Sequence, residues 1–70
     1  MRQLLAHIDG KHYRGTWDTW EDKAWGRMVE VSYSDGWLVR APVGDADPEH
    51  IAERCLEWCV REARFNNRQR

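Results

Sequence analysis

The stretch RQLLAHIDGKHYRGTW, residues 2–17, decides the fold, because both its turn and its alternation are typical of a β-hairpin. Asp9-Gly10 is a strong signal for a two-residue type I′ turn, since both central positions of that turn need positive φ angles. A turn at this point pairs Ile8 with Lys11 and sets the register of the two flanking segments. We therefore predict an antiparallel pair of strands at the start of the chain.

The two faces of this hairpin differ in polarity. In the predicted register, one face collects mostly apolar side chains: Leu4, Ala6, Ile8, Tyr13 and Trp17. The other face carries His7, His12 and Arg14, with Leu5 as the exception. This division is expected when one face of an antiparallel sheet packs on a core and the other is solvated.

A second hairpin is predicted in MVEVSYSDGWLVRAPV, residues 28–43. A three-residue loop from Ser34 to a left-handed Gly36 separates polar from apolar positions better than a two-residue loop does. Pro42 then ends the last strand or leaves it at an edge. The apolar face of this hairpin comprises Val29, Val31, Tyr33, Trp37, Val39 and Ala41, and the other face comprises Glu30, Ser32, Leu38 and Arg40.

The segment DADPEHIAERCLEWCVREARF, residues 45–65, predicts an amphipathic helix with Asp47 as N-cap and Pro48 as its first residue. Glu57 and Arg61 have the spacing and order of a stabilising i,i+4 pair. The predicted apolar side is Ile51, Ala52, Cys55, Leu56, Cys59 and Ala63, with Trp58 on its flank.

The two hairpins are joined by GTWDTWEDKAWG, residues 15–26. Asp18 followed by Glu21 resembles a capping box, and Gly26 suits the end of a helix. These signals predict one or two helical turns from Thr19 to Trp25. The alternative is that the preceding strand continues through the first two tryptophans.

Together these elements predict one α+β domain over residues 1–70. A four-stranded antiparallel sheet of two hairpins, with a short helical connector between them, carries the C-terminal helix on its apolar face. Seventy residues leave no room for a second core. We expect residues 66–70 to form a frayed basic tail.

Composition limits the classes of function. The net charge is -1, but residues 1–50 hold six basic and nine acidic side chains, whereas residues 51–70 hold five and three. No apolar run reaches the length of a membrane span, and the N-terminus lacks a signal-peptide hydrophobic segment. Cys55 and Cys59 lie four apart on the predicted helix, where a mutual disulfide is geometrically poor. We therefore expect a soluble, cytoplasmic protein with two free thiols.

Motifs for catalysis are missing. The sequence contains no G-x-S-x-G, H-E-x-x-H or G-x-G-x-x-G motif and no phosphate-binding loop. A chain this short also has difficulty enclosing a pocket of the usual several hundred Å³. We expect no enzymatic activity and no cofactor.

Two pairs of residues have side chains that can bind a metal ion. His7 and His12 face each other across the first hairpin and could share a zinc ion, but a structural site needs four ligands. Cys55 and Cys59 fall within the apolar stripe, where free cysteine packs as a small hydrophobe. We therefore expect no metal ligands and keep a metal-stapled domain as a third hypothesis.

Binding to a protein is the function that the sequence favours. Tryptophan is frequent at binding hot spots, and an acidic rim around indoles suits a partner with a basic surface. The alternatives are that the indoles complete the small core, or that Trp17 is buried while Trp20 or Trp25 faces outward. The candidate protein-binding residues are Trp17, Trp20, Glu21, Asp22 and Trp25.

A nucleic-acid-binding module is the second hypothesis. It would use the polar sheet face and the basic tail, namely His7, His12, Arg14, Arg40, Arg68 and Arg70. The acidic connector and the net charge disfavour it, because non-specific binders gain affinity by neutralising phosphates.

The small size of the chain and its lack of a signal peptide suggest a further expectation. A small Met-initiated chain without a signal peptide resembles the inhibitors and adaptors of bacteriophages and mobile elements, so we expect an inhibitor that covers a surface of a host nucleoprotein machine. We expect a monomer, or a homodimer formed through a sheet edge.

Overall fold

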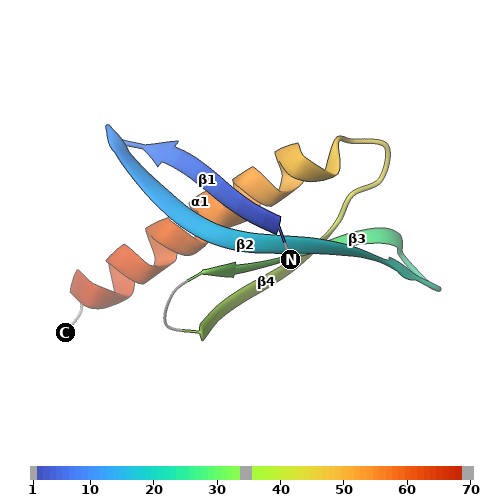
Figure 1. Cartoon of the computed structure of the whole chain (residues 1–70). Coiled ribbons are helices and arrows are strands. Elements are labelled where there is room, and N and C mark those ends of the chain that lie inside the picture. The colour runs from blue at the N-terminus through green and yellow to red at the C-terminus, as the bar shows by residue number, and fades with distance from the viewer. Residues whose placement is uncertain (1, 34–35, 69–70) are drawn as a thin grey trace.

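The computed structural model describes residues 2–33 and 36–68, with side chains as far as Phe65. In these residues an antiparallel sheet carries a helix on one face (Figure 1). The elements are β1 (Arg2–Ile8), β2 (Lys11–Asp22), β3 (Gly26–Tyr33), β4 (Trp37–Pro42) and α1 (Pro48–Arg68). The strand order is β1-β2-β3-β4, which leaves β1 and β4 at the two edges. The predicted α+β class is confirmed.

The first hairpin has the predicted register. Ile8 pairs with Lys11 and His7 with His12. Asp9 and Gly10 have φ angles of 52° and 79°, as a type I′ turn requires. The predicted apolar face is the core face, since Leu4, Ala6, Ile8 and Trp17 are buried and Tyr13 is partly buried.

The second hairpin also has the predicted register. Tyr33 pairs with Trp37, which leaves three residues in the loop, and Gly36 has a φ angle of 82°. Ser34 and Asp35 lie outside the described residues. Val29 and Val31 are fully buried on the helix side of the sheet, as the alternation predicted.

The prediction of a helical connector is wrong, and the alternative prediction of a longer strand is confirmed. β2 continues to Asp22, and residues 16–22 pair with residues 26–32 of β3. Asp18 accepts a hydrogen bond from the Thr19 backbone N–H (2.9 Å) instead of capping a helix. Gly26, with a φ angle of 77°, ends a tight turn rather than a helix. Threonine and tryptophan are both favoured in strands, which is consistent with this pairing.

The helix begins as predicted. The Asp47 carboxylate accepts a hydrogen bond from the Glu49 N–H (3.2 Å), and the Asp47 carbonyl accepts one from the Ile51 N–H (3.1 Å). Arg61 and Glu57 form the predicted i,i+4 pair at 2.7 Å. The helix continues to Arg68 and so includes the first three residues of the segment predicted as a tail.

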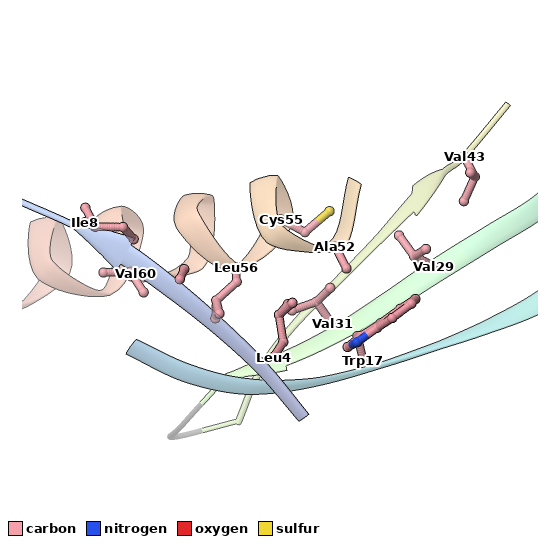
Figure 2. Packing of buried hydrophobic residues seen from close by; sticks show 11 residues of the cluster. Leu4, Ile8, Trp17, Val29, Val31, Val43, Ala52, Cys55, Leu56 and Val60 are labelled. Atoms are coloured by element: carbon pink, nitrogen blue, oxygen red, sulfur yellow. The ribbon is translucent and has the colours of Figure 1, made fainter. Parts of the chain in front are cut away.

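The core lies between the sheet and α1. Figure 2 shows side chains from both layers pointing into this space. Leu56 and Val60 of α1 are completely buried, and Val60 was not among the predicted core residues. Gly15 is buried where β2 passes beneath Leu56. No helix in the described part of the chain has the length and apolar character needed to cross a bilayer.

Candidate protein-binding surface

The candidate surface lies on the outer half of the β2–β3 hairpin, residues 18–30, which we call the arm. The hairpin is long because β2 has 12 residues, five of which extend beyond its pairing with β1. Figure 1 shows the β2–β3 turn reaching beyond α1 and the other strands. The fold therefore places this turn where a partner can approach it.

Trp17 belongs to the core and not to this surface. Only 5% of the residue is exposed, and it lies beside Val31 and Leu4 in Figure 2. The Arg2 guanidinium lies 5.0 Å from the ring centroid and covers it at the sheet edge. Its assignment to the binding surface is wrong, because its strand position faces the helix.

Trp20 lies on the opposite face of β2, which α1 does not cover. Residues three apart on a strand point to opposite faces, so Trp17 and Trp20 separate. Trp20 is partly exposed, and the Arg40 guanidinium lies 5.9 Å from its ring centroid. Arg40 also donates a 2.9 Å hydrogen bond to Glu30. The indole is therefore held in place and keeps part of its surface accessible.

Trp25 is the most exposed large apolar residue in the described chain, with 70% of its surface accessible. It occupies the turn between β2 and β3. The Asp22 carboxylate accepts hydrogen bonds from the backbone N–H groups of Ala24 (2.8 Å) and Trp25 (3.1 Å). Asp22 therefore shapes the turn that presents the indole, and its carboxylate is engaged within the chain.

The charges of the arm are mainly acidic. Glu21 is exposed and forms a 3.3 Å ion pair with Arg27, which is also exposed. Asp18 is exposed on the same strand. An exposed ion pair of this kind contributes little to stability, so both partners can form new contacts at small cost. Of the five predicted protein-binding residues, Trp20, Glu21 and Trp25 thus remain accessible.

The residues predicted for nucleic-acid binding do not form one cluster. The exposed rings of His7 and His12 stack with centroids 4.5 Å apart and planes at 11°. Arg14 is exposed on the same strand as His12. Arg40 lies on β4, two strands away, and is paired with Glu30. Two strand spacings alone separate them by roughly 10 Å. The Arg68 side chain and Arg70 lie outside what the structure describes.

Neither pair weighed for metal binding has further ligands nearby. Among the described residues, no group of three His, Cys, Asp or Glu side chains could hold a metal ion. Cys55 and Cys59 are free and buried. Burial raises the pKa of both thiols; at Cys55 the charge of Arg54 partly opposes this effect. Thiols held protonated in this way are poor nucleophiles and poor metal ligands.

A groove between β4 and α1 was missed by the sequence reasoning. It has a volume of about 660 Å³, is open to solvent, and is lined by apolar side chains together with Arg54. The apolar lining of this β4–α1 groove includes Leu38, Val39, Ala41, Ile51, Cys55 and Trp58. The exposed position of Trp58 on the helix flank was the only signal available from the sequence.

Comparison of the chain with protein-family models, curated proteins and solved structures finds no match.

Proposed function

We propose that this protein is a non-catalytic binding module that docks on a protein partner through the arm. The observation that carries the proposal is the 70% exposure of Trp25 at the end of a turn fixed by Asp22. Tryptophan is highly buried on average in folded proteins and is enriched at binding hot spots, so an indole this exposed is a candidate contact.

The free energy available at this position is substantial. An indole buries roughly 150–250 Å² when it is enclosed, and each Å² of apolar burial contributes about 25 cal/mol. Enclosing the exposed part of Trp25 would therefore contribute about 3–4 kcal/mol before the costs of association. Trp20 adds a second, partly exposed ring on the strand that leads to the turn.

The acidic side chains of the arm indicate the character of the partner. Asp18 and Glu21 are exposed on either side of Trp20 in the sequence. Charges at the rim of an interface mainly set specificity and association rate, so a basic protein surface fits this arm. Surfaces that hold nucleic acid are basic, and we extend the proposal to an inhibitor that covers such a surface, of the kind that phages and mobile elements use.

The experiment is affinity capture from the native cell with four forms of the tagged chain. These are the wild type, Trp25→Ala, Trp20→Ala and Phe65→Ala. Phe65 is the matched control, because it is a half-exposed aromatic residue (55%) on the helix, outside both the arm and the β4–α1 groove. Circular dichroism and urea titration confirm that each variant is folded before capture.

We expect a protein that the wild type and Phe65→Ala retain and that Trp25→Ala loses. If the arm variants lose the partner because they unfold, Trp20 and Trp25 stabilise the fold, and the proposal is wrong. The alternative of a nucleic-acid-binding module would be supported if the chain captures nucleic acid instead. Its affinity for that nucleic acid should then fall steeply with salt, and His7→Ala and Arg14→Ala should weaken the binding.

A further inference from the structure

The β4–α1 groove combines an apolar floor with an unpaired strand edge. Val39, Ala41 and Ile51 are only partly buried along it, and Trp58 is 51% exposed at its side. The Trp58 ring packs edge-to-face on Trp37, with centroids 6.3 Å apart, which fixes that wall. An occupant of this groove would lie directly beside β4.

The free edge of β4 offers backbone hydrogen bonds in a defined pattern. Val43 donates its N–H to the Arg27 carbonyl of β3 (2.9 Å). In an antiparallel ladder, alternate residues direct their N–H and C=O groups toward the partner strand. The peptide groups of Leu38 and Arg40 therefore point away from β3. Pro42 offers only its carbonyl at the same edge.

This edge selects a polypeptide rather than a small molecule. Donors and acceptors repeat every second residue, and only another extended chain supplies partners at that spacing. Side chains on alternate residues of an added strand would point into the apolar groove. The six residues of β4 can pair with a segment about 20 Å long.

Arg54 supplies the charge that the occupant must match. It lines the groove and forms no ion pair with any carboxylate that the structure describes. The groove lining contains no acidic side chain, so the groove of a second copy would offer Arg54 no carboxylate. Charge complementarity therefore favours a different chain that carries a carboxylate.

We propose that β4 and the groove bind an extended peptide segment as a fifth strand, with apolar side chains at alternate positions and one Asp or Glu against Arg54. This site is separate from the one in the proposed function, because its lining includes none of Trp20, Glu21 and Trp25. Failure of either proposal leaves the other standing.

The test begins with selection of a phage-displayed random dodecapeptide library on the full chain. Leu38→Pro serves as the counter-selection, since proline removes an edge N–H that β3 does not use and is tolerated on edge strands. A synthetic peptide from the selection is then titrated against the wild type, Arg54→Glu and Arg14→Glu. Arg14→Glu makes the same charge change on the opposite face of the sheet.

We expect selected sequences with alternating apolar residues and a carboxylate. Arg54→Glu should weaken the peptide about tenfold or more, whereas Arg14→Glu should change its affinity less than twofold. Methylating the peptide's backbone nitrogens one at a time should weaken binding at every second position. This measurement does not require Leu38→Pro to be folded.

Three results would overturn the proposal. The first is that no sequence is enriched over the counter-selection. The second is that selected peptides bind Arg54→Glu as well as they bind the wild type. The third is a concentration-dependent dimer in sedimentation that Leu38→Pro abolishes, which would assign the edge to a second copy of the chain.

Discussion

Replacing Gly15 by alanine tests the close approach between β2 and α1. A β-carbon at this position would lie 2.8 Å from the Ser32 carbonyl oxygen and 2.9 Å from Leu56 Cδ1. Both distances are well below ordinary van der Waals contact. The oxygen belongs to the backbone of β3, and the Leu56 side chain is completely buried, so neither can yield without displacing the sheet or the helix.

The expected cost follows from these contacts. Overpacking a well-packed core costs about 1–3 kcal/mol. Alanine regains about 0.5–1 kcal/mol because it restricts the unfolded chain more than glycine does. We therefore expect Gly15→Ala to lower the free energy of unfolding by about 0.5–2 kcal/mol in a urea titration, with an unchanged m value.

A double-mutant cycle with Leu56→Ala identifies the cause. Removing the leucine methyl groups takes away one of the two close contacts, so Gly15→Ala should cost less in that background, by about 0.5–1 kcal/mol. A neutral or stabilising effect of Gly15→Ala in the wild-type chain would refute the packing of β2 against α1 described above.

Five other substitutions probe the core, the turn and the thiols. Trp17→Ala should lower the free energy of unfolding by about 3–5 kcal/mol, and Trp25→Ala should change it by less than about 0.5, both measured by urea titration. Asp22→Ala should cost about 1 kcal/mol, because two backbone N–H groups of the turn lose their acceptor, whereas the exposed Glu21→Ala should stay within about 0.5 by the same assay. Burial raises the pKa of the Cys59 thiol above its ordinary value of 9.0. As the pH rises past 9.0, the unfolded thiol therefore ionises before the native one, and the free energy of unfolding should fall by up to about 1.4 kcal/mol per pH unit. Urea titrations across that range should show a shallower fall for Cys59→Ala.

The hairpin registers were predictable because local and non-local signals agree. The Asp9-Gly10 turn and the alternation around it lead to the same pairing of Ile8 with Lys11. At the second hairpin, polarity alone selected the three-residue loop that ends at Gly36. When turn chemistry and alternation coincide, one sequence is enough to fix a strand pair.

The connector shows where local signals conflict. Asp18 and Glu21 have the spacing of a capping box, but both lie on a strand. What decides the outcome is the pairing of residues 16–22 with β3 through a turn at residues 23–25, and the sequence DKAWG, residues 22–26, contains no Asn-Gly or Asp-Gly turn signal that would predict a hairpin there. The burial of Trp17 and the exposure of Trp25 follow from this pairing, so the sequence could offer them only as alternatives.

The position of the β4–α1 groove could not be predicted, because Trp58 on the helix flank does not show which strand lies beside it. It lies between α1 and the edge strand β4, so its width depends on how α1 is oriented over the sheet. A helix crossing angle depends on how side chains interlock between the layers, and the amphipathic pattern carries no such information. The need for glycine at position 15 has the same origin, because it depends on where Leu56 comes to lie.

The affinity of the captured partner for Trp25→Ala tests the central claim most directly. With purified proteins in a calorimetric titration, we expect the Kd to rise by about 30-fold, the effect of a 2 kcal/mol hot spot, while the free energy of unfolding stays within about 0.5 kcal/mol of the wild type. An unchanged Kd for this folded variant would contradict the account, because the indole at the end of the arm would then make no contact that matters for binding.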